Sequence, residues 1–157
     1  MKNSEESPAK KETIITLNKK AYHEYEIIQK YEAGIALLGT EIKSIRVHRA
    51  NIADAYARIK NGELWLVNSN IPAYKFGNIN NHVPLRERKL LLHKLELKKI
   101  DTKLKDKGLA LIPLKMYFLG AKVKLEIGIG KGKKSYDKRE SIKKADIKRQ
   151  LARVKAN

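Results

Sequence analysis

An Asn61-Gly62 dipeptide between two short apolar segments constrains the fold of this chain more than any other feature of its sequence. The segments on either side, residues 54–60 and 63–67, contain aliphatic and aromatic side chains of the kind found in β-strands. Asn-Gly readily adopts the two positive φ values of a type I′ turn, which joins neighbouring antiparallel strands. The sequence therefore predicts a β-hairpin over residues 54–67.

A second hairpin is predicted from residues 110–118 and 122–129, with its turn at residues 119–121. Its second strand alternates charged and aliphatic residues, which are Lys122, Lys124 and Glu126 against Val123, Leu125 and Ile127. A period of two places the two sets on opposite faces of a sheet. One face of this hairpin is therefore expected to contact solvent.

Residues 24–28 and 34–38 also have strand composition and form either one long strand or two. Gly34 suggests a bend or a bulge between them. Residues 68–85 contain Pro and many Asn, which indicates a surface loop.

Three helical segments are expected. Asn18 can cap a short turn of helix that begins at Lys19. Residues 40–46 have helical spacing, and the side chains are assigned to two faces: Ile42 and Ile45 inward, and Glu41, Lys43 and Arg46 outward. Residues 85–107 are predicted as one long helix that ends at Gly108, because apolar residues recur at spacings of seven, three and four, at Leu90, Leu97, Ile100 and Leu104.

The expected fold is mainly β, with several antiparallel strands around one helix in residues 13–130. A small closed barrel of the oligonucleotide-binding (OB) type, with accessory helices, fits this pattern because closure removes exposed strand edges. An open α+β sandwich is the alternative. Residues 1–12, which mix both charge signs with Ser and Pro, are expected to be a disordered leader.

Residues 131–157 form a basic C-terminal tail with eleven Lys or Arg against three acidic residues. Its few large apolar side chains cannot bury enough surface to offset the entropy lost on ordering. Basic residues also recur four apart along it, and such pairs repel each other on a helix. The tail is therefore expected to be disordered in the free protein and to become helical only when a polyanion surrounds it.

The charge of the whole chain indicates a polyanionic partner, because 35 Lys and Arg against 17 Asp and Glu give a net charge of +18. Residues 13–130 contribute +10 of this charge and the tail contributes +8. The tail lacks the broad apolar face of a membrane-surface helix, and no segment has the roughly 20 apolar residues that span a bilayer. Nucleic acid is the expected partner, and the protein is expected to be cytoplasmic and not bound to membrane.

The residues give no support for a catalytic, metal or cofactor site. The chain has no Cys, and its four His lack metal-ligand spacing. The Gly-rich segment at residues 128–135 fails the Walker pattern at Ile127 and the dinucleotide pattern at Lys133. The scattered Glu residues are interpreted as solvated counter-charges, so we expect no cofactor and no enzyme activity.

Five segments of the chain resemble, in order, the signatures of the SsrA-binding protein family, also called small protein B. They are residues 18–25 (NKKAYHEY), 31–37 (YEAGIAL), 39–46 (GTEIKSIR), 88–92 (RKLLL) and 130–139 (GKGKKSYDKR). The resemblance extends over most of the chain, and five motifs in one order argue against a chance match. It implies a six-stranded OB barrel with accessory helices.

The function implied by this resemblance is bacterial trans-translation. Such a protein binds the tRNA-like domain of transfer-messenger RNA (tmRNA, or SsrA), promotes its aminoacylation and delivers it to stalled 70S ribosomes for rescue and tagging of the nascent chain. The barrel would take the place of an anticodon arm in the decoding centre, and the tail would enter the empty mRNA channel as a helix. The free protein is expected to be a monomer.

The resemblance also assigns residues. Glu32 and Leu91 match positions that support RNA binding, and the tail element needed after delivery comprises Lys131, Gly132, Lys133, Lys134, Tyr136, Asp137, Lys138 and Arg139. His93 and Tyr136 depart from common family residues, an Asn and a His. Phosphate contacts are expected from Lys19, Lys20, Arg46, Arg86, Arg88 and Lys89, and base stacking from His23, Tyr25 or His93.

Two other functions remain open from the sequence. A structural ribosomal protein would share the charge, the barrel and the tail, but it would copurify with all ribosomes and not mainly with stalled ones. An enzyme, such as a nuclease, would need to use the scattered carboxylates and would turn over RNA in the presence of Mg²⁺.

Overall fold

A computed structural model describes residues 11–77, 81–133 and 135–155 of the chain. Seven strands and four helices lie in this part of the sequence. In chain order they are β1 (Glu12–Leu17), α1 (Lys19–Glu24), β2 (Tyr25–Ile35), α2 (Gly39–Arg46), β3 (Tyr56–Lys60), β4 (Glu63–Val67), β5 (Arg88–Leu91), α3 (Lys94–Leu104), β6 (Leu109–Leu119), β7 (Lys122–Gly132) and α4 (Ser135–Lys155). The expected leader begins outside the described residues, and its last residue, Glu12, already belongs to β1.

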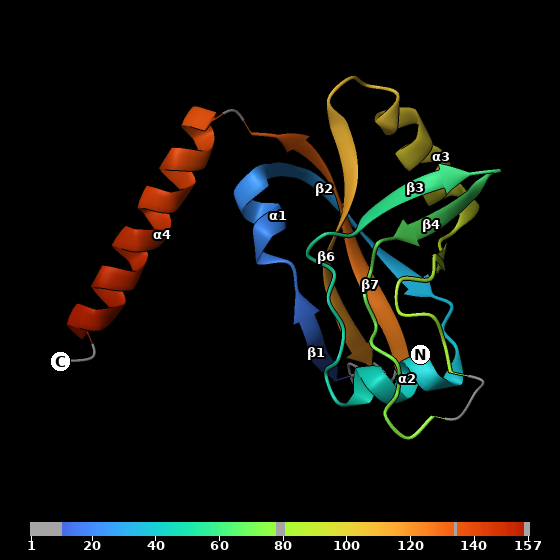
Figure 1. The fold of residues 1–157 in the computed structure, drawn as a ribbon. Helices are drawn as coiled ribbons and strands as arrows, with labels where there is room; N and C mark the ends of the chain where they lie inside the picture. The colour runs from blue at the N-terminus through green and yellow to red at the C-terminus, as the bar shows by residue number, and fades with distance from the viewer. Residues whose placement is uncertain (1–10, 78–80, 134, 156–157) are drawn as a thin grey trace, which may run out of the picture.

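Six of the strands close into a barrel. They pair in the order β6, β3, β4, β5, β2 and β7, and β7 returns to pair with β6, so that the ring is complete. All of these pairings are antiparallel, and β1 adds to the outside of the ring by pairing with β6. This ring confirms the predicted OB-type closed barrel with accessory helices and rejects the open sandwich (Figure 1).

The barrel interior is filled with aliphatic side chains from alternate positions of each strand. Completely or almost completely buried members include Leu64, Leu66, Leu90, Leu111, Met116, Leu125 and Ile127. Ile45 of α2 and Ile100 of α3 join the same core, and Figure 1 shows these two helices toward opposite ends of the barrel. Each such side chain contributes about 1.5–3 kcal/mol when it leaves water, so the barrel is a rigid support for its outer surface.

Both predicted hairpins are confirmed. Asn61 and Gly62 have φ values of 53° and 73°, as a type I′ turn requires, and they join β3 to β4. Gly120, with a φ of 63°, lies in the turn between β6 and β7. The exposed set of β7 also lies outward, since Leu125 and Ile127 are buried while Lys122 is exposed.

The first helical signal is also confirmed. The Asn18 side chain accepts a hydrogen bond from the backbone N–H of Ala21 at 3.1 Å, which caps α1. Its amide group donates to the carbonyl of Pro113 at 2.8 Å and to that of Ile52 at 3.3 Å. Asn18 therefore ties α1 to the barrel as well as starting the helix.

The two predicted segments, residues 24–28 and 34–38, contribute to one strand, β2, but only in part: Glu24 belongs to α1, and residues 36–38 follow the end of the strand at Ile35. Its register shift lies between Ile27 and Gln29 and not at Gly34, so the bulge, one of the two alternatives for Gly34, is rejected, and the bend stays a prediction. Gly34 is instead the residue at which β2 has a partner on each edge, because it is paired with Lys124 of β7 on one side and with Leu91 of β5 on the other.

The prediction of one helix over residues 85–107 was also wrong. Residues 88–91 form the strand β5, and α3 begins only at Lys94. Arg88 and Leu90 point inward and Leu91 outward, which is the alternation of a strand. The spacing of seven between Leu90 and Leu97 therefore joins two different elements and does not describe one helical face.

Residues of the tail form the helix α4, which leaves the barrel after β7 (Figure 1). Its described side chains, residues 139 and 143–152, are exposed, and Ile147 and Leu151 are 56% and 58% accessible. Burial of these side chains thus contributes little to the helix. The expectation that the tail is disordered in the free protein remains a prediction for solution experiments.

Candidate nucleic-acid interface

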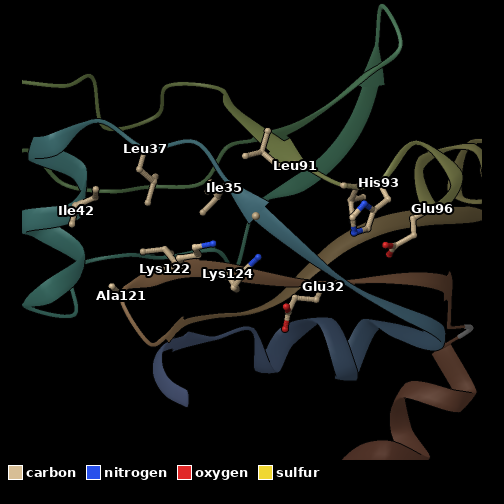
Figure 2. A pocket seen from close by; sticks show the side chains of 13 residues that line it. Glu32, Ile35, Leu37, Ile42, Leu91, His93, Glu96, Ala121, Lys122 and Lys124 are labelled. Carbon is tan, nitrogen blue, oxygen red and sulfur yellow. The ribbon is translucent and has the colours of Figure 1, made fainter. Parts of the chain in front are cut away.

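A groove of about 820 Å³ lies on the outer surface of the barrel where β5, β2 and β7 meet. Figure 2 shows its lining side chains, which come from these strands, from α2 and α3, and from the connecting residues Leu37, Leu92, His93 and Ala121. This groove is called the outer groove below, and the lining residues that matter most for the argument are Glu32, Gly34, Leu91, His93, Lys122 and Lys124. Three of the residues predicted from the sequence, Glu32, Leu91 and His93, are therefore brought together.

The outer groove exists because of strand alternation and a missing side chain. Tyr31, Ala33 and Ile35 of β2 point into the core, which leaves Glu32 and Gly34 on the outer surface. A Cβ atom at Gly34 would lie 3.3 Å from the Cβ of Leu91, closer than most real Cβ contacts. Gly34 thus lets β2 and β5 approach each other while Leu91 remains 51% exposed.

The Glu32 carboxylate is positioned from the neighbouring part of the barrel by a tyrosine. The Tyr117 hydroxyl of β6 donates a hydrogen bond to it. Burial, and next the hydrogen bond and charge of Glu32, raise the pKa of Tyr117, so the phenol keeps its proton and remains a donor. Lys115 lies 4.9 Å from the centre of the Tyr117 ring and forms an ion pair with Glu12 at 2.5 Å. This arrangement restrains Glu32 at the edge of the outer groove.

The rim of the outer groove combines cations with an exposed imidazole. Lys122 and Lys124 belong to β7 on one side of the groove. His93, the residue before α3, lies on the other side (Figure 2). Lysine ammonium groups can neutralise phosphates, Glu32 can accept hydrogen bonds from base amino groups or ribose hydroxyls, and Leu91 offers an apolar contact. The outer groove can therefore bind a folded RNA through the phosphates of the RNA backbone and through a small apolar contact with Leu91.

Arg88 does not lie on this surface, which corrects its prediction as a phosphate contact. It is completely buried, and its guanidinium donates to Glu41 at 2.5 Å, to the Ser69 carbonyl at 2.9 Å and to the Pro84 carbonyl at 3.0 Å. Arg86 also donates to Glu41, at 2.5 Å, and about a third of its side chain is exposed. Arg88 therefore holds the loop between β4 and β5 against the barrel.

Glu41 was predicted to point outward from its helix, and it is instead completely buried. Burial alone would raise its pKa, but hydrogen bonds from Arg86, from the Leu38 N–H and from Arg88 outweigh this effect and lower the pKa. The carboxylate is therefore ionised and locks α2 to the strand β5. Helical spacing assigned Glu41 to the outer face because it could not show its two arginine partners. They lie 45 and 47 positions after Glu41 in the sequence.

The remaining predicted residues lie outside the outer groove. Lys19, Lys20, His23 and Tyr25 belong to α1 and the start of β2, and Lys20 forms an ion pair with Asp54 at 3.2 Å. Two more basic residues are also separate from the groove lining: Arg46 is exposed at the end of α2, and Lys89 of β5 forms an ion pair with Glu63 at 3.1 Å. The structure thus separates the predicted phosphate contacts into several surface regions.

The start of the tail is attached to α1. Lys131 and Gly132 complete β7, and the backbone N–H of Lys133 donates to the Glu24 carbonyl at 2.9 Å. The Lys133 ammonium also donates to the Tyr22 carbonyl, at 3.0 Å. Lys134 lies outside the described residues, and the other predicted tail residues, Tyr136, Asp137, Lys138 and Arg139, belong to α4.

Sequence reasoning missed Gly34, Tyr117, Lys122 and Lys124 as parts of the site. The alternation in residues 122–127 had placed the two lysines on a solvent face, but it could not show which strand would lie beside them. Gly34 and Leu91 are separated by 57 positions, and only barrel closure places them together. In the described part of the chain, no group of three or more His, Cys, Asp or Glu is arranged to hold a metal ion. None of the helices described is long and apolar enough to cross a membrane.

Comparisons with known proteins agree on one family. Residues 15–157 match the family described as "SmpB protein". The chain is 56% identical over 143 residues to an SsrA-binding protein of Carboxydothermus hydrogenoformans, with 91% of this chain and 96% of the relative covered. It is 52% identical over 155 residues to that of Syntrophobacter fumaroxidans, with 99% and 96% covered.

A solved structure is also similar. It shares 44% sequence identity with this chain and superimposes with a TM-score of 0.66, covering 81% of this chain and 93% of the other. That structure comes from work described as "tmRNA-SmpB: a journey to the center of the bacterial ribosome".

Proposed function

Because the chain belongs to the SmpB protein family, we propose that it binds the tRNA-like domain of tmRNA and acts with it in trans-translation on stalled ribosomes. The SsrA-binding proteins to which it is similar are named for this RNA, and the similar solved structure concerns tmRNA with SmpB on the bacterial ribosome. The protein would work in the cytoplasm, as a binding factor and not as an enzyme.

The observation that carries this proposal is the outer groove, where Gly34 of β2 separates an exposed Leu91 on β5 from Lys124 on β7, and where the restrained Glu32 lies two residues along β2 from Gly34. Lys122 and Lys124 would neutralise phosphates of the folded RNA, which supply most of the affinity. Glu32 would accept hydrogen bonds from an unpaired base or a ribose hydroxyl, a group that distinguishes RNA from DNA. Leu91 would pack against a base or sugar that the bend of the RNA exposes.

A rigid groove also suits the other parts of the proposed function. A barrel that holds the tRNA-like domain in one orientation would promote its aminoacylation, because the acceptor end would be presented in a fixed geometry. In the decoding centre, the same barrel would occupy the space of the anticodon arm that a complete tRNA has and the tRNA-like domain lacks. Restrained side chains lose little entropy on binding, which favours such a role.

The tail would then act after delivery. α4 has 21 residues, and a helix rises about 1.5 Å per residue, so it would extend roughly 30 Å along an empty mRNA channel. Its basic side chains would face ribosomal phosphates there. Attachment of Lys133 to α1 would fix the direction in which the tail leaves the barrel.

A competition experiment tests the proposal. Labelled tRNA-like domain is bound to the full chain and displaced by unlabelled tRNA-like domain or by ordinary tRNA. A clear preference for the former is expected, and Leu91→Ala should weaken binding by about 5- to 30-fold, which corresponds to a loss of about 1–2 kcal/mol on truncation of one interface side chain. Leu95→Ala is the matched control, because Leu95 is exposed on α3 and does not line the outer groove. Equal displacement by both RNAs would overturn the proposal.

A further inference from the structure

The loop between β4 and β5 presents a second surface, which the outer groove does not include. It carries Tyr74, Lys75 and Phe76, and the Phe76 side chain is 80% exposed. The two rings meet edge to face, with centroids 5.8 Å apart. Lys43 of α2 lies 5.5 Å from the centre of the Tyr74 ring, and Lys75 lies 5.9 Å from the centre of the Phe76 ring. These four residues are called the aromatic platform.

The aromatic platform is held in place by an asparagine. The Asn81 side chain accepts a hydrogen bond from the Tyr74 N–H at 3.2 Å and donates one to the Tyr74 carbonyl at 2.7 Å. The same carbonyl accepts a bond from the Gly77 N–H at 2.9 Å. A Cβ atom at Gly77 would lie only 2.5 Å from the Asn81 amide nitrogen, so any other residue there would displace the Asn81 side chain from this position. The backbone beside the two rings is therefore fixed before any partner arrives.

Further hydrogen bonds attach this loop to α2. Ser44 donates to the Pro72 carbonyl at 2.7 Å. The buried His82 ring lies 2.8 Å from the Thr40 hydroxyl and 2.7 Å from the Ile71 carbonyl. These buried and half-buried hydrogen bonds restrain the described part of the loop, yet the Phe76 side chain in it remains in water. Such an exposed ring contributes little to stability and is available for a partner.

We propose that the aromatic platform binds an unpaired RNA base, which stacks on Phe76 while Lys43 and Lys75 neutralise the phosphates beside it. Exposed aromatic rings flanked by cations are the usual means of holding single-stranded nucleic acid, because every base has a face that can stack. The cations around the rings and the net charge of +18 disfavour an apolar protein segment and favour a polyanion.

Position supports the same occupant. Helix α2 contributes Ile42 to the lining of the outer groove and the next residue, Lys43, to the aromatic platform. An RNA held in the outer groove can therefore continue over α2 and place an unpaired nucleotide on Phe76. The inference rests on the proposed function to the extent that the partner is RNA. It adds a second contact, which distinguishes an unpaired base from a paired one.

Binding of a short RNA to the full chain tests the platform. The probe is a labelled unpaired RNA of about ten nucleotides, within the range that one OB-type domain covers. Phe76→Ala should weaken its binding by about 5- to 100-fold, the loss expected for one base-stacking ring. A duplex RNA of the same length should bind both proteins equally, because its bases are already stacked on each other. Tyr56→Ala, which removes a ring that is 42% exposed on β3, serves as the matched control.

Two further variants separate stacking from general damage. Gly77→Ala removes no ring and no charge, but it displaces Asn81 and should weaken the same unpaired RNA. Phe76→Trp should retain binding. In a Trp65→Phe background, which removes the single native tryptophan, the fluorescence of the Phe76→Trp variant should be quenched when a base stacks on the introduced ring. The thermal midpoint of Phe76→Ala should match the wild type, since the side chain is 80% exposed.

The outcomes distinguish this inference from the proposed function. If Phe76→Ala binds unpaired RNA as tightly as the wild type, or if the fluorescence of the Phe76→Trp variant does not change, the platform is not a stacking site, even when the tRNA-like domain still binds with preference. If the wild type fails to prefer the tRNA-like domain but loses unpaired RNA on Phe76→Ala, the proposed function fails and the platform stands. If Phe76→Ala lowers only the binding of ribosomal proteins stripped of RNA, the platform is a protein-docking surface and the inference is overturned.

Discussion

The barrel region, residues 13–130, and the tail, residues 131–157, carry comparable net charges of +10 and +8 but differ in what supports them. The groove is built on a closed barrel, and a buried Glu41 with its two arginines fixes α2 and the adjoining loop beside it. The described side chains of α4 are exposed, and basic residues repeat four positions apart along it. The difference teaches that basic charge alone does not define a binding site: the barrel fixes where its charges lie, whereas we expect the tail to be organised by its partner.

The largest expected effect comes from removing the tail while the barrel stays intact. Deleting residues 135–157 should abolish tagging of stalled nascent chains and retain most of the affinity for the tRNA-like domain. The cut spares Lys131 and Gly132, because they pair with β2 as part of β7. Tagging in a reconstituted translation system and binding by filter retention measure the two functions. Parallel loss of both would show that the two regions do not divide the work.

The buried ion pair of the barrel should have a large effect on stability. Arg88→Met leaves Glu41 without its fully buried partner, and breaking such a pair costs about 3–5 kcal/mol. Lys89→Met is the matched control on the same strand, because its pair with Glu63 is partly exposed and such pairs contribute about 0–1 kcal/mol. Urea denaturation of both variants gives the two values. Similar losses for both would mean that Arg88 does not hold the barrel surface.

A smaller effect concerns the salt dependence of binding to the isolated tRNA-like domain. Each phosphate contact adds a slope of about −0.7 to −0.9 to the plot of log affinity against log salt. Lys124→Ala should therefore reduce the slope by about one contact, whereas Lys143→Ala on α4 should leave it unchanged. Titrations at several salt concentrations measure the slopes. An equal change for both variants would place the tail, too, on the tRNA-like domain.

The smallest effect is on acid stability. The pKa of Glu41 is lowered in the folded protein, so its stabilising contribution is present above the ordinary value near 4.5 and is lost as the pH falls through the folded-state pKa. Glu41→Gln should be less stable than the wild type at neutral pH and should lose less further stability below about pH 4.5. Asp146→Asn on α4 should leave the profile of the wild type unchanged. Thermal melts from pH 7 to pH 3 measure this, and parallel profiles for Glu41→Gln and the wild type would contradict it.

Local chemistry was enough to predict much of the fold. The Asn61-Gly62 turn, the Gly120 turn and the Asn18 cap depend on residues next to them, and each was confirmed. The strand β5 was missed because its four residues are too few to show a strand pattern by themselves. It forms because it pairs with β4 and β2. The buried position of Arg88 follows from the same pairing. The positive charge of the residue had instead predicted an exposed phosphate contact.

The candidate site was predicted only in part for a related reason. Glu32, Leu91 and His93 were named because of a resemblance, and barrel closure brings them into one groove. Gly34 carries no side chain to suggest a role, and its importance appears only with Leu91 opposite it. Residues of a site that comes from distant strands are predictable one by one, but their arrangement requires the register of the sheet.

Hydrogen exchange of the free protein and of its complex with stalled ribosomes tests the central claim most directly. In the free protein, amides of β6 and β7 should exchange slowly, near the limit set by global unfolding, and amides of residues 135–155 should exchange as fast as an unstructured chain. On the ribosome the tail amides should become protected. Tail amides that are as protected as those of β6 and β7 in the free protein would contradict the claim that only the barrel is organised before binding.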